Sequence, residues 1–197
     1  AAKCDDADKK DTFEAIIMAL DSAVILAHRY ADIAEKDAET ASADRAEELL
    51  LMAKTLRRVP ELGAESLYES IQSFIILWQV MCIEQAPNPF AFSVGNADRI
   101  FEPYRQMSGE TRDEATALFR HFLVFFNVAD RSWAISQNIL ISGRDLEGND
   151  LTNETTYALM DAYYDMNLPQ PILSVKLHKN TPEKLYREMG RFFFTPG

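Results

Sequence analysis

The sequence predicts a predominantly helical α/β fold in which a helical bundle leads into a parallel βαβ unit. Apolar residues recur at helical spacing from position 12 to position 136, whereas two short β-rich runs occupy positions 138–142 and 171–177. A helix-forming segment lies between these two runs. A strand, helix and strand in this order form a crossover, which requires parallel strands. We therefore expect at least five helices covering more than half of the chain, and two parallel strands.

The βαβ unit is marked by the residues that begin and end its elements. Gly143 ends the first apolar run, and a polar loop at 144–150 follows it. Thr152 or Asn153 can cap the next helix, with Glu154 well placed against the helix dipole. Two prolines then end the helix before the second apolar run begins. The unit continues into a last helix at about 181–193, whose start has a threonine cap, a proline and an acidic first turn.

The helical part precedes this unit. Residues 1–11 are polar and are expected to form a disordered tail. Helices are then expected at 12–40, 42–56, 66–85, 98–107 and 111–136, with capping residues before several of them. The helix at 66–85 is apolar over most of its circumference and should be deeply buried, and Pro103 should kink or stop the helix at 98–107. We see no second-domain boundary. The chain is thus one segment, with 12–136 helical and 137–194 a βαβα unit.

Charge and composition exclude several classes of partner. The formal net charge is −11, whereas nonspecific binding to nucleic acid or to anionic lipid needs a basic surface. No apolar run reaches the length of a membrane-spanning helix. Cys4 and Cys82 make no disulfide framework, and two reduced thiols fit a cytoplasmic protein. The chain starts at Ala1 without methionine, which suggests a piece of something longer.

The sequence offers few residues for catalysis or metal binding. The loop at 144–150 fails the calcium-loop spacing, since Gly148 comes too early and position 12 counted from Asp145 is Thr156. The three histidines are scattered without metal-ligand spacing, and neither a nucleophile elbow nor a glycine-rich phosphate loop is present. No metal or small cofactor is therefore expected in this chain.

Several short motifs occur in a characteristic order. The loop after Gly143 has the form D-x-x-G-x-D-x-T-N-E, and the second strand reads Q-P-x-L-S-V. Upstream lie Ala27–Ala31, Val59-Pro60 followed by Glu69–Gln72, and Gly95–Asp98. Over residues 13 to 194 this order resembles the glycyl radical enzymes, the pyruvate formate-lyase-like family. Asn96 replaces the arginine usual in that family. Lys176 also falls at a usual arginine position, where it could serve as an ion-pair partner, and we assign it no catalytic role.

The resemblance implies an α/β barrel in which a glycyl radical, installed by a radical SAM activase, generates a thiyl radical. The family's G-C-x-E loop and R-V-x-G-Y context are absent from this chain, and Cys82 lies within a predicted helix. The implied function is that of an internal fragment of an anaerobic radical lyase, dehydratase or formate acetyltransferase-like enzyme, supplying barrel wall and inactive alone. The alternative is a self-standing, non-catalytic helical interaction module. Either would expose apolar surface, to which the rest of the parent polypeptide or a second copy would bind.

The resemblance also singles out Asp98. The matching aspartate lies near the substrate pocket in some members, such as the choline-cleaving lyases, so Asp98 is the candidate substrate-binding residue. A second role remains open, in which the carboxylate caps or hydrogen-bonds the loop at 86–97.

Overall fold

The computed structural model describes residues 7–84, 93–127 and 137–194. The chain divides into two compact units, one of residues 1–64 and 72–80 and the other of residues 65–71 and 81–197. Helix α3 (Leu67–Glu84) contributes residues to both units. Two of its three boundaries, after residues 71 and 80, fall within the continuous helix α3, so no linker marks the division there. A boundary inside a helix leaves no local signal in the sequence, which accordingly predicts a single segment.

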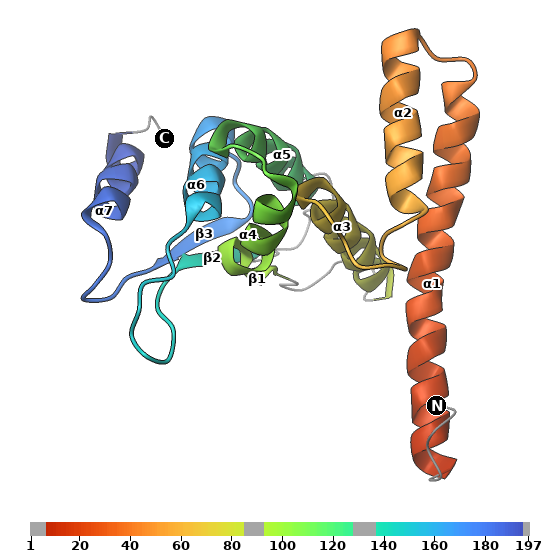
Figure 1. Cartoon of the computed structure of the whole chain (residues 1–197), viewed down its shortest axis with the longest axis horizontal. Coiled ribbons are helices and arrows are strands. Elements are labelled where there is room, and N and C mark those ends of the chain that lie inside the picture. Colours follow the sequence, from red (N-terminus) through yellow and green to blue (C-terminus); the bar gives the residue numbers. More distant parts are fainter. Residues whose placement is uncertain (1–6, 85–92, 128–136, 195–197) are drawn as a thin grey trace. The chain divides into compact units, whose positions relative to one another are not determined.

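The first unit is built on a helical hairpin. Helices α1 (Ala7–Ala38) and α2 (Ala43–Leu56) lie side by side (Figure 1). Small side chains let the two backbones approach closely, and the shared core consists of Ala27, Ala31, Ala34, Leu49, Ala53, Leu56 and Ile76. The Arg57 guanidinium, just after α2, binds Asp32 at 2.5 Å and Glu35 at 2.8 Å on α1. Apolar packing and ion pairing thus both hold this hairpin.

Helix α1 departs from expectation at its start. It begins at Ala7, so the prediction of a disordered tail was wrong for residues 7–11; residues 1–6 lie outside the described part. Local pairs support the extra turn, since Thr12 Oγ1 donates to the Asp8 carbonyl at 2.9 Å and Lys10 lies 3.8 Å from Glu14. The large apolar residues of this half remain 43 to 74% exposed, namely Phe13, Ile16, Ile17, Met18 and Leu20.

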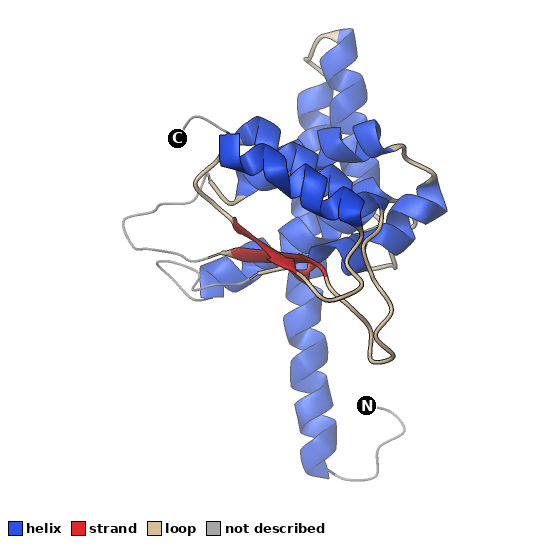
Figure 2. Cartoon of the chain, turned by 90° about the vertical axis from the view of Figure 1, so that its left-hand side faces the viewer, coloured by secondary structure: helices blue, strands red, loops and turns tan. Residues whose placement is uncertain are grey.

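The second unit contains a three-stranded parallel sheet in the order β1 (Gly95–Asn96), β2 (Asn138–Ser142), β3 (Ile172–Lys176) (Figure 2). The parallel pairing of β2 with β3 confirms the predicted crossover, with Ser142 opposite Lys176 at its end. Strand β1 was not predicted. It has two residues, and Gly95 has φ +73°, a left-handed conformation that glycine adopts without strain. Its pairing with Ile139 and Leu140 can only be seen in three dimensions.

Helices complete the unit: α4 (Ala97–Ser108), α5 (Arg112–Phe125), α6 (Glu154–Met166), α7 (Glu183–Gly190) and the 3₁₀ helix η1 (Arg191–Phe194). The predicted capping box of α5 is present, with Thr111 and Glu114 bonded reciprocally. Helix α4 contacts β2 and α6, and α5 packs along α6. Their core is aromatic, because Phe101, Phe119, Phe122 and Phe126 meet in tilted and edge-to-face pairs at 5.1 to 6.3 Å.

Three expectations for these helices need correction. Helix α4 continues through Pro103 and so does not stop there, and Glu102 binds both Arg105 and Gln106 across the proline at 2.8 Å; a kink at Pro103 stays a prediction. Helix α5 ends at Phe125 rather than near position 136, and 128–136 lie outside the described residues. The end of α3 is not deeply buried, since Met81 is 41% and Ile83 67% exposed. No helix in the described ranges is long and apolar enough to cross a bilayer.

We predict that Phe122→Ala lowers the free energy of unfolding by about 3–5 kcal/mol, because it opens a cavity among three other rings. Phe122 is fully buried, whereas Phe193 is 81% exposed and provides the matched control. Phe193→Ala should change the free energy by less than about 0.5 kcal/mol. Denaturant titration of both variants measures the difference, and equal losses would contradict the assigned core.

Candidate functional site

Two buried carboxylates on α4 organise the carboxyl end of the sheet. Asp98 and Glu102 lie one helical turn apart, and both reach the first turn of α6. They are placed there because α4 begins directly after β1, so its first turns lie beside the end of β2. The sheet edge, α4 and α6 are therefore joined by side chains from a single helix.

Asp98 has no solvent exposure and accepts three hydrogen bonds. Its Oδ1 accepts from the backbone N–H of Arg99 at 2.8 Å. Its Oδ2 accepts from the backbone N–H of Ser142 at 2.5 Å and from the Thr156 hydroxyl at 2.7 Å. Both oxygens are thus engaged by groups of the chain itself. None of these three donors belongs to the loop at 86–97, so the geometry supports a positioning role at the end of β2 and the start of α6, and substrate contact by Asp98 stays a prediction.

Burial dominates the electrostatics of Asp98. Removal from water raises the pKa of the Asp98 carboxyl, while the hydrogen bonds from Ser142, Thr156 and Arg99 oppose that rise. A buried carboxylate held by three donors is costly to leave unpaired, so the three donors fix its position.

Glu102 has a different environment because a cation accompanies it. Its carboxylate pairs with Arg105 through two hydrogen bonds of 2.8 Å and accepts from the Thr155 hydroxyl at 2.7 Å and N–H at 3.2 Å. Burial alone would raise the pKa of Glu102, but the bonds from Arg105, Thr155 and Gln106 outweigh it and lower the pKa to about 2. Glu102 thereby places a negative charge at the N-terminus of α6, where the helix dipole favours it.

The chain turns sharply at the end of β2. Ser142 is fully buried with φ +61°, a left-handed conformation rare for a residue with a side chain. Its N–H is held by Asp98, its carbonyl accepts from Arg99 Nη2 at 3.1 Å, and its hydroxyl lies 2.9 Å from that of Thr152. These contacts fix the turn at the end of β2, and with it the position of the next residue, Gly143.

The loop after Gly143 borders an open hollow of about 660 Å³, lined by Arg99, Arg144, Asp145, Leu146, Glu147, Gly148 and Leu151. Asp145 binds the Asn149 amide and backbone N–H, each at 2.8 Å, which makes the loop a closed turn. His178 Nε2 lies 3.0 Å from Asp150 Oδ1. No cluster of metal-ligating side chains occurs within the ranges that the structure describes.

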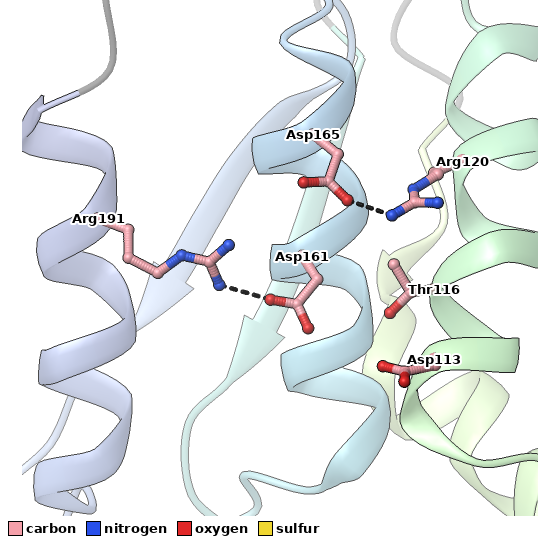
Figure 3. Close-up of a pocket in the computed structure, with 6 residues that line it drawn as sticks. All are labelled: Asp113, Thr116, Arg120, Asp161, Asp165 and Arg191. Atoms are coloured by element: carbon pink, nitrogen blue, oxygen red, sulfur yellow. Dashed lines mark hydrogen bonds and ion pairs between the residues drawn. The ribbon is translucent and has the colours of Figure 1, made fainter.

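A second, smaller cleft of about 230 Å³ lies between α5, α6 and η1 (Figure 3). Its charged groups are largely paired: Asp161 binds Arg112 at 2.6 Å and Arg191 at 2.5 Å, and Asp165 binds Arg120. Burial opposes ionisation of Asp161, but the two arginines prevail and lower the pKa of its carboxyl. The ion pairs that line this cleft therefore hold η1 and α5 against α6.

Comparison with known proteins identifies the fold family. The family described as pyruvate formate-lyase-like matches residues 1–196. The chain belongs to this family. Among curated relatives, isethionate sulfite-lyase of Bilophila wadsworthia is 29% identical over 93% of this chain, and trans-4-hydroxy-L-proline dehydratase of Clostridioides difficile is 30% identical over 91%. The chain spans about a quarter of the length of these relatives, 24% and 25% respectively.

Solved structures agree with this assignment. The glycerol-bound form of the B12-independent glycerol dehydratase from Clostridium butyricum aligns with a TM-score of 0.87 and 27% identity, over 96% of this chain and 26% of that one. A glycyl radical enzyme from Archaeoglobus fulgidus aligns with a TM-score of 0.81 and 26% identity, over 88% of this chain and 24% of that one. The resemblance inferred from short motifs is confirmed, as is the α/β fold class.

The sequence singled out Asp98, whose substrate-binding role stays a prediction, but it did not indicate the residues around it. Arg99, Glu102, Ser142 and the two threonines at 155 and 156 were not singled out. One local signal was available, since Asp98 and Glu102 are four residues apart and share one face of a helix. The contacts between α4 and the residues that follow position 141 carry no local signal.

We predict that Asp98→Asn lowers the free energy of unfolding by about 1–3 kcal/mol. In the wild type both carboxylate oxygens accept hydrogen bonds, whereas in the variant one oxygen is replaced by an NH₂ group, which would face an N–H or O–H donor. Asp37→Asn, at an exposed position, is the control and should leave the unfolding midpoint unchanged. If Asp98 instead contacts substrate, the unfolding midpoint should stay unchanged while kcat/KM falls by about tenfold to a thousandfold in the polypeptide at its full encoded length.

A pH prediction follows from Glu102. Its folded pKa of about 2 lies below the ordinary value of 4.5, so its contribution to stability is complete above pH 4.5 and is lost as the pH falls toward 2. We expect Glu102→Gln to flatten the dependence of unfolding free energy on pH in this window by up to about one bound proton. Exposed Glu39→Gln is the control, and equal slopes for wild type and Glu102→Gln would refute the assignment.

Proposed function

We propose that this chain is an internal segment of a glycyl radical lyase or dehydratase, where it forms part of the wall of the α/β barrel. The observation that carries the proposal is the alignment of 96% of the chain with a quarter of a glycerol dehydratase. Several relatives are likewise lyases, dehydratases or a decarboxylase by name. Because of its similarity to these enzymes, we also propose that the protein acts in anaerobic metabolism in the cytoplasm.

The residues of this chain suit a part of the barrel wall and not the centre that carries the radical. Neither a G-C-x-E string nor an R-V-x-G-Y string occurs in the sequence. Cys82 lies within α3, and burial raises the pKa of its thiol to about 11. The residues of this chain therefore do not fit the radical group. In our proposal the radical glycine and its cysteine partner lie outside residues 1–197, and a radical SAM activase installs the radical.

Within such an enzyme this segment would supply rigid positioning. Asp98 and Glu102 join the end of β2 to the start of α6, so the groups at the carboxyl end of the sheet cannot shift independently. Ligands of parallel α/β sheets bind outside the carboxyl ends of the strands. The segment thus holds one side of a substrate pocket, with Asp98 as the residue that positions Ser142 and Gly143.

A second candidate function is a self-standing, non-catalytic interaction module. The exposed apolar residues of α1 favour it, because surfaces of this kind bind partners. In the enzyme proposal the rest of the polypeptide covers that surface, whereas in the module a second copy or another protein does. Intact mass of the protein isolated from its cells, compared with the coding frame, separates the two.

We predict a glycyl radical EPR doublet after anaerobic activation of the polypeptide at its full encoded length, and none on residues 1–197 alone. The reason is that both radical-bearing motifs are absent from this chain. Cys82→Ser in the full-length polypeptide should keep both the doublet and turnover, because Cys82 is a helix thiol.

Two results would overturn the proposal. A doublet on the isolated 197-residue chain would place the radical within it. Absence of any doublet from a full-length polypeptide that folds and is treated with an active activase would exclude glycyl radical chemistry.

A further inference from the structure

Two cations lie side by side at the carboxyl end of the sheet. A Cβ atom built on Gly143 would lie 2.9 Å from Arg99 Nη2 and 3.2 Å from Lys176 Cβ. The Arg99 guanidinium and the Lys176 stem thus both pass over the same backbone atom. Gly143 itself has φ +106°, so glycine is required here both for the turn and for this close approach.

Neither cation has a carboxylate in direct contact within the described residues. Among the residues that the structure describes, neither Arg99 nor Lys176 lies in an ion pair. The Lys176 ammonium donates to Asn96 Oδ1 at 3.0 Å, a neutral acceptor on β1. Arg99 donates to the neutral carbonyl of Ser142, and its buried Nε has no partner within the described part of the chain. The closest carboxylate in sequence, Asp98, accepts instead from Ser142, Thr156 and the Arg99 backbone.

This arrangement is unusual for a protein with a net charge of −11. Like charges repel each other, and most other arginines of this unit pair with carboxylates, as Arg105, Arg112, Arg120 and Arg191 do. Two adjacent cations with donors to spare are the arrangement that binds a carboxylate or a related oxyanion.

The surroundings limit what can bind. Arg99 lines the hollow of about 660 Å³, a volume within the range of small-molecule sites. Arg144 lines it too, as do two carboxylates, Asp145 and Glu147, of which Asp145 already binds Asn149. These carboxylates disfavour a polyanion. A small molecule with one anionic group directed at Arg99 and Lys176 fits the charges best.

We propose that Arg99 and Lys176 form a subsite for the oxyanion group of a small molecule, held over Gly143 at the carboxyl end of the parallel sheet. This deepens the proposed function, on which it rests, by assigning the pocket to anionic rather than neutral substrates. Lys176 supplies a point charge bridging β3 to Asn96 on β1, and Arg99 supplies directed N–H donors from α4.

The test is ligand binding measured by NMR or calorimetry on the polypeptide at its full encoded length, at low ionic strength and constant chloride. Acetate, methanesulfonate and inorganic phosphate are the anionic probes, and glycerol is the neutral one. We expect saturable millimolar binding of at least one anion that glycerol does not displace. The anion that binds most tightly identifies the chemical group.

Variants assign this binding to the two cations. Lys176→Gln should weaken it at least about fivefold, because a charge-assisted hydrogen bond is lost, and Lys176→Arg should retain it. Lys179→Gln is the matched control, since Lys179 is an exposed lysine in the turn three residues after Lys176 in the chain. Circular dichroism establishes that each variant is folded.

Three outcomes overturn the proposal: no saturable anion binding, equal weakening by Lys179→Gln, or no weakening by Lys176→Gln. The first is also the result expected if a carboxylate of the polypeptide itself occupies the subsite. Because binding needs no radical, failure here with an intact EPR doublet would refute the subsite and leave the proposed function standing. A missing doublet with intact, Lys176-dependent binding would do the reverse.

Discussion

The second unit depends on two buried carboxylates of one helix. Asp98 holds the N–H of Ser142 at the end of β2 and the hydroxyl of Thr156 in α6, and Glu102 holds Thr155 beside it. Each carboxylate satisfies donors that would otherwise be left unpaired at a strand end or a helix N-terminus. Removing Asp98 would therefore affect α4, β2 and α6 together, whereas removing Glu102 would affect α4 and α6.

The pKa values of the two buried carboxylates shift in opposite directions. Glu102 has Arg105 as a partner, and the pKa of Glu102 falls to about 2. Asp98 has only neutral donors in direct contact, and burial raises its pKa. The cation next to Asp98, Arg99, turns its guanidinium to the Ser142 carbonyl instead. Within the described residues Arg99 therefore forms no ion pair and lies near Lys176 at the sheet edge, which is the feature on which the proposed anion subsite rests.

The first unit presents a different balance of forces. Alanines and leucines form the core between α2 and the C-terminal half of α1. The large apolar residues in the N-terminal half of α1 remain exposed. Membership of the pyruvate formate-lyase-like family and coverage of about a quarter of each relative give this exposure a physical reason. In our proposal these side chains are core residues of a larger fold, so their hydrophobicity reflects packing partners that lie elsewhere in it.

The sequence by itself determined the helical character, the βαβ crossover and the family. Caps, prolines and apolar periodicity are local signals, and the loop and strand motifs around Gly143 are specific. It placed the start of α5 and the strands β2 and β3, but residues 7–11 are helical rather than a disordered tail, and α4 does not stop at Pro103. There the i,i+4 pairs of α1 and the bonds of Glu102 across the proline outweighed local propensity.

Only the tertiary structure decided the site. Strand β1 has two residues and acquires its identity by pairing with β2, which no local pattern can encode. The sequence singled out Asp98, yet its partner Ser142 lies 44 positions away. The meeting of Arg99 with Lys176 over Gly143 likewise depends on how α4 and β3 pack against the end of β2. Such contacts join segments distant in sequence, and burial and charge act on them only once the chain has folded.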